Sequence, residues 1–314
     1  MTNPKISVVI PVYGCKDALE ELCARLITTL TSLTKNYEII LVNDACPQDS
    51  WSIIEKLCKN DNHIVGIELS RNFGQMKAVL AGLDIVTGDY IVVMDCDLQD
   101  QPEEIPKLFA KLNEGYDIVF AKRVSRKDTK RKIFIAKMFY KLYSFAVGQK
   151  YDPELCNFCI TKRNVINEYC KMREEHRAFV MYLQWLGFKQ TSIAVKHADR
   201  KSGKSSYSLK KRLKLAFEIL SSQSDKFLRL IMGLGFTIRL LAFFAIFILV
   251  ICYITMPNQV PGWTSTVTAI FLMGGINIAV VGFVGLYVGN IFIQVKERPL
   301  YVIRNIINGK EATK

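Results

Sequence analysis

The sequence predicts an α/β domain with a mostly parallel sheet, followed by an α-helical hairpin that crosses a membrane twice. Between residues 6 and 120, short apolar runs alternate with segments of helical periodicity. This alternation is typical of parallel sheets that are covered by helices on both faces. From Leu240 to Val295 the chain has no Asp, Glu, Lys, Arg or His. Such a run exceeds the roughly 20 residues that one membrane crossing needs, so two crossings are expected.

Within the α/β domain, the continuous apolar runs predict strands and the segments between them predict helices. The predicted strands are 6–12, 38–43, 64–69, 90–94 and 117–120, and the predicted helices are about 16–33, 49–60, 74–86 and 102–114. Ligands of such sheets bind beyond the carboxyl ends of the strands. The residues found at these ends are Pro11, Tyr13, Asp44, Arg71, Asp95 and Asp97. A binding site is therefore expected along this edge.

The apolar region is interrupted by a stretch with two prolines at 257–262, which predicts transmembrane helices near 233–256 and 265–291. Lys and Arg flank the pair on both sides, while the connecting loop is uncharged. The positive-inside rule then places both termini and the α/β domain in the cytoplasm. Gly285 and Gly289 have the small-xxx-small spacing that permits close helix packing, which would allow a homo-oligomer through these helices.

The predicted organisation therefore has four parts. The α/β domain spans 1–208, and a basic amphipathic juxtamembrane helix spans 209–232. The two transmembrane helices lie within 233–291, and a cytoplasmic tail spans 292–314. No signal peptide precedes the first strand, so the α/β domain is expected to stay in the compartment of synthesis.

The net charge of +13 is concentrated in two stretches. Residues 121–150 hold ten Lys and Arg against one acid, and residues 196–232 hold ten against three. Both interleave charge with apolar residues at helical spacing, which favours helices that lie in an anionic membrane interface. Ordinary amphipathic helices with solvated basic faces are the alternative. Nucleic-acid binding is disfavoured, because no motif for it accompanies the charge.

Nine cysteines are scattered along the chain, and most are flanked by apolar residues. This usage predicts reduced thiols packed in the core of a cytosolic domain. Cys156 and Cys159 have CxxC spacing, but a zinc site would need a second pair of suitably spaced ligands. We therefore do not predict a metal site there.

Asp95 and Asp97 directly follow the predicted strand 90–94. Two carboxylates at positions i and i+2 beyond a strand can turn toward one hard cation, and Mg²⁺ and Mn²⁺ prefer such oxygen ligands. An isolated Asp-x-Asp is more often a solvated turn or a helix cap. The buried strand before the pair, and Asp44 at another strand end, favour a metal site that serves a diphosphate.

These motifs resemble those of family 2 glycosyltransferases with the GT-A fold, in the branch of dolichyl-phosphate mannose synthase and the bacterial polyprenyl-phosphate glycosyltransferases. The matching segments are 7–13 (SVVIPVY), 41–44 (LVND), 70–74 (SRNFG) and 88–100 (GDYIVVMDCDLQD), together with Pro102, Glu103 and Arg200. With the two C-terminal helices they span nearly the whole chain.

The resemblance implies inverting transfer of a sugar from a nucleotide-sugar, with UDP favoured, to polyprenyl phosphate at the cytoplasmic membrane face. The implied nucleotide contacts are Pro11, Tyr13, Asp44, Arg71 and Asp95. The implied ligands of Mg²⁺ or Mn²⁺ are Asp97, Gln99 and Asp95. The implied contacts to the acceptor phosphate are Arg123, Arg126 and Lys204, and Arg200 would close over the diphosphate.

One departure from the family pattern concerns the catalytic base. Related enzymes often have Gly-Asp-Phe-Arg at residues 156–159, where this chain has Asn157 in place of the Asp. An amide cannot take a proton at neutral pH. Asn157 thus fits a phosphate acceptor, which needs positioning more than deprotonation, or the base lies elsewhere, with Asp152 the nearest candidate. Transfer to a hydroxyl of a lipid-linked saccharide and a non-catalytic membrane scaffold are the alternative functions.

Overall fold

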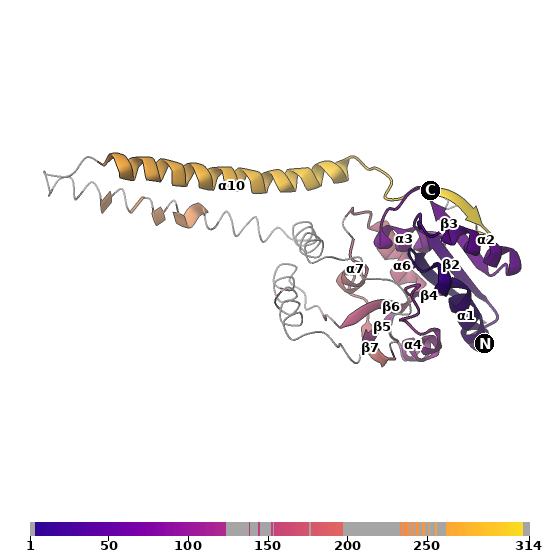
Figure 1. Cartoon of the computed structure of the whole chain (residues 1–314). Coiled ribbons are helices and arrows are strands. Elements are labelled where there is room, and N and C mark those ends of the chain that lie inside the picture. Colours follow the sequence, from indigo (N-terminus) through magenta and orange to yellow (C-terminus); the bar gives the residue numbers. More distant parts are fainter. Residues whose placement is uncertain are drawn as a thin grey trace. The chain divides into compact units, whose positions relative to one another are not determined.

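The computed structural model describes residues 4–123, 154–175, 177–196 and 262–309, together with positions 138, 144, 152 and several between 233 and 255. The described strands form one eight-stranded sheet in the order β7-β5-β6-β4-β1-β2-β3-β8 (Figure 1). Their bounds are β1 Ile6–Val12, β2 Tyr37–Asn43, β3 Ile64–Leu69, β4 Tyr90–Val93, β5 Ile118–Arg123, β6 Leu155–Lys162, β7 Gln190–Val195 and β8 Ile303–Ile307.

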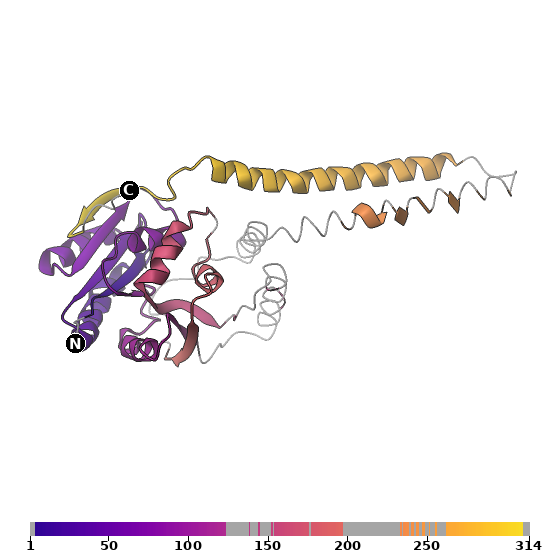
Figure 2. The same ribbon diagram turned by 180° about the vertical axis from the view of Figure 1, so that it is seen from behind.

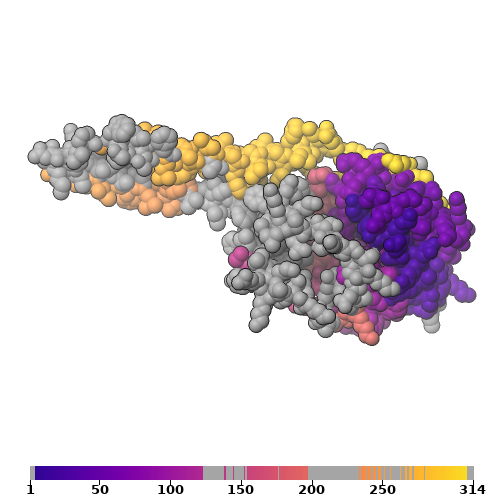
Figure 3. Space-filling view, viewed as in Figure 1, coloured from indigo at the N-terminus to yellow at the C-terminus, as the bar shows by residue number. Residues whose placement is uncertain are grey.

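Helices cover both faces of this sheet (Figures 1 and 2). One face packs against α1 (Leu19–Leu33), α2 (Ser50–Asn60) and α4 (Ile105–Leu112), and the short helices η1 (Lys16–Ala18) and η2 (Pro102–Glu104) lead into α1 and α4. The other face packs against α3 (Gln75–Leu83), α6 (Arg163–Lys171) and α7 (Phe179–Trp185). In the space-filling view the indigo and purple residues form one continuous body (Figure 3).

The central strand β1 is buried on both sides, which explains its continuous apolar run. Val8 and Ile10 belong to the hydrophobic cluster on one face and Val9 belongs to the other, and none of the three is exposed. Successive side chains of a strand point to opposite faces, so both faces must be apolar here. Gly82 lets α3 lie close to β1, because a Cβ atom at this position would be 2.4 Å from Val9 Cγ1.

All five predicted strands and all four predicted helices are confirmed, with small shifts at their ends. The sheet also contains β6, β7 and β8, which the sequence pattern does not predict. β6 runs antiparallel to β4 and β5, and β8 runs antiparallel to β3, so the sheet is mixed. β8 lies in the segment 292–314, for which the sequence predicts only a tail.

Helix α10 (Trp263–Val295) belongs to a compact unit separate from the one that holds the sheet. Within it, Leu272–Val295 is long and apolar enough to cross a membrane, and among the described residues it is the one helix that is. The first predicted crossing, 233–256, falls largely outside the described residues, although the positions described within it are helical. That crossing remains a prediction. The basic stretches 121–150 and 196–232 also lie mostly outside the described residues, which include only 121–123, 138, 144 and 196 of them.

Candidate active site

The carboxyl ends of β4, β1 and β2 adjoin at one edge of the sheet, because β1 pairs in parallel with both neighbours. Pro11 is buried within β1, and Tyr13, just beyond that strand, is 50% exposed. The backbone N–H of Asp44 donates to the carbonyl oxygen of Val12 at 3.1 Å. Asp95 follows the end of β4 on the other side of β1. The structure thus places Tyr13, Asp44 and Asp95 at the edge where the sequence predicts a binding site.

Asp95 and Asp97 begin a compact turn that is closed by its own hydrogen bonds. The N–H of Asp95 donates to the carboxyl group of Asp100 at 3.3 Å, and the N–H of Gln99 donates to Asp97 Oδ1 at 3.1 Å. Leu98 is buried with a φ of 61°, a left-handed conformation that is costly for a residue other than glycine. The side chains of Asp95 and Asp97 are only partly buried, so a ligand can approach them.

Asp44 is buried and anchors the loop at 70–75. Its Oδ1 and Oδ2 accept hydrogen bonds from the backbone N–H groups of Phe73 (2.7 Å) and Gly74 (2.9 Å). Burial raises the pKa of Asp44 above its ordinary value, although these two bonds and the charges of Arg71 and Lys77 act in the opposite direction. The Arg71 guanidinium lies over the Phe73 ring at 4.1 Å. The carboxyl group predicted to contact a nucleotide therefore also fixes this loop.

The same loop contacts Asp95 through Gln75, a residue that the sequence pattern does not indicate. Gln75 Nε2 donates to Asp95 Oδ1 at 2.7 Å. Gln75 is the first residue of α3 and directly follows the 70–74 motif, which is the one sequence signal that could have indicated it. The loop therefore contacts the acidic residues at two different strand ends.

Asn157 lies in β6, two residues before Cys159, which pairs with Val93 at the end of β4 in the antiparallel register of the two strands. Cys156 packs against the hydrophobic cluster on one face of the sheet, while Cys159 lies in the cluster on the other. The two thiols of the CxxC sequence therefore face away from each other.

Asp152, the alternative candidate for the base, forms an ion pair with Lys122. Lys122 Nζ lies 3.0 Å from Asp152 and 2.9 Å from Glu154, and the hydrogen bonds to Glu154 and Asp152 raise the pKa of Lys122. Arg123 ends β5, but its side chain lies outside the described residues, as do Arg126, Arg200 and Lys204.

Cys15 and Cys96 are joined by a disulfide, with their Cα atoms 6.2 Å apart. The prediction of reduced thiols is therefore wrong for this pair. The physical reason is the sheet topology: each cysteine follows a strand end, and the two strands, β1 and β4, are neighbours. Both half-cystines are buried, at 3% and 7% exposed. The free cysteines that are buried in the core, as predicted, are Cys23, Cys46, Cys58 and Cys159.

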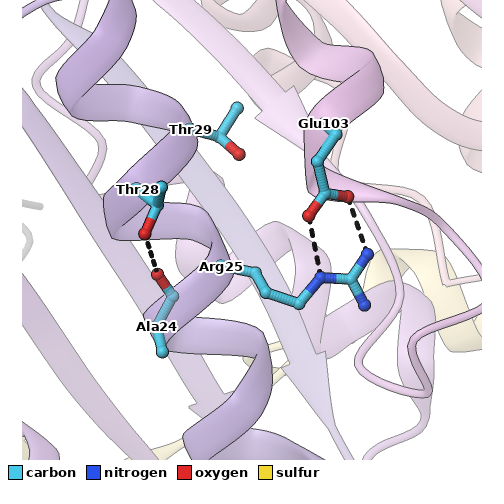
Figure 4. Close-up of a pocket in the computed structure, with 5 residues that line it drawn as sticks. All are labelled: Ala24, Arg25, Thr28, Thr29 and Glu103. Atoms are coloured by element: carbon cyan, nitrogen blue, oxygen red, sulfur yellow. Dashed lines mark hydrogen bonds and ion pairs between the residues drawn. The ribbon is translucent and has the colours of Figure 1, made fainter.

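A pocket between α1 and η2 contains none of the predicted site residues (Figure 4). It is lined by Ala24, Arg25, Thr28, Thr29 and Glu103. Arg25 Nε and Nη2 donate to the two carboxylate oxygens of Glu103 at 2.8 and 2.7 Å. Glu103 therefore connects η2 to α1 and has a structural role.

The groups at the end of β4 fit a hard divalent cation. The carboxylates of Asp95 and Asp97 and the side-chain carbonyl of Gln99 offer oxygen ligands only, which Mg²⁺ and Mn²⁺ prefer. In the part of the chain that the structure describes, no group of three or more His, Cys, Asp or Glu side chains is arranged to hold a metal by itself. A cation here would share its coordination with water or an anionic ligand.

Comparisons with known proteins identify the family of the chain. Residues 7–170 match the family model described as Glycosyl transferase family 2. The chain is 36% identical over 303 residues to an uncharacterized glycosyltransferase of Synechocystis sp., covering 96% of this chain and 95% of the relative. It is 33% identical over 307 residues to the undecaprenyl-phosphate 4-deoxy-4-formamido-L-arabinose transferase of Enterobacter sp., covering 97% and 94%.

Among solved structures, the chain is similar to mannosyl-3-phosphoglycerate synthase from Rubrobacter xylanophilus, with a TM-score of 0.48 and 12% identity, over 69% of this chain and 72% of the other. That likeness is too distant to assign a substrate. The family match covers both strand ends that hold the acidic residues, and the relatives match over almost their whole length. The chain therefore belongs to glycosyl transferase family 2.

Proposed function

We propose that this glycosyltransferase moves a sugar from a nucleotide-diphosphate sugar to polyprenyl phosphate at the cytoplasmic membrane face, with inversion at the anomeric carbon, in cell-surface glycan synthesis. The observation that carries the proposal is the loop 70–75, which joins buried Asp44, at the end of β2, to partly exposed Asp95, beyond the end of β4 on the other side of β1. A donor with a nucleoside at one end and a diphosphate in the middle would extend along this edge. UDP-sugars are the first donors to test.

Three features support a lipid acceptor. The Enterobacter relative carries undecaprenyl phosphate in its name, and α10 contains a segment apolar enough to cross a membrane. The predicted basic stretches at 121–150 and 196–232 would attract anionic headgroups and a lipid phosphate. In this proposal the protein is a membrane protein with two crossings, and its catalytic domain lies in the cytoplasm.

The side chains at the end of β4 would serve the diphosphate. Asp97, with Gln99 and Asp95, would hold Mg²⁺ or Mn²⁺, and the bound ion would offset the negative charge that develops on the leaving group. Gln75 fixes the orientation of Asp95 by its hydrogen bond. Asp44 holds the loop and lies where the nucleoside would bind.

The nature of residue 157 favours a phosphate acceptor over a hydroxyl. A hydroxyl nucleophile needs a general base, but Asn157 cannot serve as one and Asp152 is paired with Lys122. The second pKa of a phosphate monoester is about 6, so it is largely ionised at neutral pH. Such an acceptor mainly has to be held in line with the anomeric carbon.

The test is a transfer assay with membranes that contain the full chain. Labelled UDP- and GDP-sugars are supplied with Mg²⁺ or Mn²⁺ and undecaprenyl phosphate, and lipid products are identified by mass spectrometry. We expect Asp97→Ala to lower the rate by about 100-fold or more, since several kcal/mol of charge stabilisation would be lost. Glu103→Gln is the matched control, because Glu103 lies in the same motif but binds Arg25; it should keep the wild-type rate.

The alternatives have distinct outcomes in this assay. Full activity of Asp97→Ala would contradict the metal assignment. A sugar attached to a lipid-linked saccharide, and lost in Asp152→Asn, would favour the hydroxyl acceptor. Tight binding of UDP or GDP without turnover of any sugar nucleotide would favour a non-catalytic scaffold.

A further inference from the structure

β8, the strand that follows α10 along the chain, belongs to the same eight-stranded sheet as β1 and β3. β8 pairs antiparallel with β3, with Ile307 opposite Gly66 and Ile303 opposite Leu69. The far end of the strand is held by Asn308, whose Nδ2 donates to the carbonyl oxygens of Cys58 (2.7 Å) and Ile64 (3.0 Å). The near end of β8 lies beside Ser70, where the loop 70–75 begins.

At this near end, both backbone polar groups of Ser70 are engaged by the C-terminal segment. The N–H of Ser70 donates to the carbonyl oxygen of Val302 at 2.9 Å. Arg304 Nη2 donates to the carbonyl oxygen of Ser70 at 2.8 Å, and its Nη1 lies 3.3 Å from Glu68 Oε1. The first residue of the loop is therefore held from outside the loop.

The other end of the loop is held by the acidic residues of the site. Phe73 and Gly74 donate to Asp44, and Gln75 donates to Asp95. Two exposed residues, Arg71 and Asn72, lie between these two points of attachment. Release of the Ser70 end would let the loop move relative to both carboxyl groups.

The contact of Arg304 is poorly suited to a purely structural role. The Arg304 side chain is 60% exposed, and exposed ion pairs contribute only about 0–1 kcal/mol to folding stability. Its shorter hydrogen bond goes to the backbone carbonyl oxygen of Ser70 in the loop 70–75, and the Glu68 carboxylate is farther away. Through its contact with Ser70, Arg304 can instead affect the position of the loop 70–75.

We propose that residues 302–304 position the loop 70–75 for binding of the nucleotide-diphosphate sugar, and that Arg304 is the positioning residue. The inference rests on the proposed function, since it assigns the loop to the donor. Arg304 acts through Ser70 and does not contact the donor itself. The segment that follows the membrane helix thereby completes the donor site of the catalytic domain.

The test compares full-chain Arg304→Ala, Arg304→Lys and Asn308→Ala with the wild type. The donor KM and kcat are measured with the sugar nucleotide that supports transfer, and UDP and GDP affinities are measured by calorimetry. Hydrogen–deuterium exchange reports on residues 70–76. Asn308→Ala is the matched control, because it releases the other end of β8 and leaves the contacts to Ser70 in place.

For Arg304→Ala we expect donor KM and nucleotide Kd to rise about two- to tenfold, the range that one net hydrogen bond gives, with kcat within about twofold of wild type. Exchange in 70–76 should be faster. Arg304→Lys should restore part of the lost donor affinity, because an ammonium group can still donate a hydrogen bond to the carbonyl oxygen of Ser70. Asn308→Ala should leave the donor KM unchanged even if it lowers the melting temperature.

Two results would overturn the inference: unchanged KM and exchange in Arg304→Ala, or an equal rise of KM in Asn308→Ala, which would indicate simple docking of the strand. Failure of the proposed function looks different, because the wild type itself would then show no transfer. Even then the exchange of residues 70–76 decides whether Arg304 holds the loop.

Discussion

Replacement of Asp44 separates the role that the structure shows, as anchor of the loop 70–75, from the role that we propose, as contact for the nucleoside. Asp44→Ala removes both acceptors of the Phe73 and Gly74 N–H groups, which bond to its carboxyl oxygens at 2.7 and 2.9 Å. Hydrogen bonds to a charged group contribute about 1.5–3 kcal/mol each. Since burial of Asp44 offsets part of this gain, we expect the free energy of unfolding to fall by about 2–4 kcal/mol.

Asp44→Asn keeps one carbonyl acceptor but turns an amide donor toward the other N–H group. We therefore expect the free energy of unfolding to fall by the contribution of one of the two hydrogen bonds, roughly 1–3 kcal/mol. Urea unfolding of the full chain in detergent gives the stability, and hydrogen–deuterium exchange gives the local protection of Phe73 and Gly74. Asp17→Ala, which removes an exposed carboxylate in η1, is the control. The reasoning is refuted if Asp44→Ala changes neither the stability nor the exchange of this loop, even if it abolishes nucleotide binding.

Two further predictions concern the catalytic domain as a whole. Burial alone would raise the pKa of Glu38, but hydrogen bonds, chiefly from Ser7 and Thr87, outweigh it and hold the pKa below the ordinary value of 4.5. Folding thus favours the ionised form, so the stability lost in Glu38→Gln should be largest at neutral pH and should shrink as pH falls below 4.5 in urea unfolding; a constant difference would contradict this. The Cys15–Cys96 bridge spans 81 residues, which corresponds to about 4.5 kcal/mol in the loop-entropy model. Dithiothreitol should therefore lower the melting temperature of the wild type but not that of Cys15→Ser, and equal sensitivity would argue against the bridge.

The strands that the sequence predicts are those that are buried over all or most of their length. β1 and β2 are buried at every position, and a continuous apolar run is a local signal. β7 and β8 are partly exposed along most of their length, and β8 includes Arg304 and Asn305. Their pairing depends on partners far away in the sequence, such as Gly66 for Ile307. No local pattern carries that information.

In the candidate site too, the residues that can be predicted are those with a local sequence signal. Asp44, Asp95 and Asp97 can be selected from the sequence, because an acidic residue after a buried strand is unusual in a core. Gln75 cannot be selected in this way, since an exposed glutamine at the start of a helix is ordinary and only its contact with Asp95 makes it notable. The disulfide is missed for a related reason. The proximity of its cysteines follows from the order of strands in the sheet, which the sequence pattern alone does not give.

The position of β8 after α10 has a consequence for the biosynthesis of the protein. A ribosome makes residues 303–307 only after it has made the whole of the apolar helix. Until then the outer edge of β3 exposes unpaired N–H and C=O groups, which are open to pairing with other chains. The nascent domain also lacks the contacts of Val302 and Arg304 to Ser70. If the helix enters the membrane during translation, as the proposed function implies, the order of synthesis would delay the pairing of β8 with β3 until the chain has reached the bilayer.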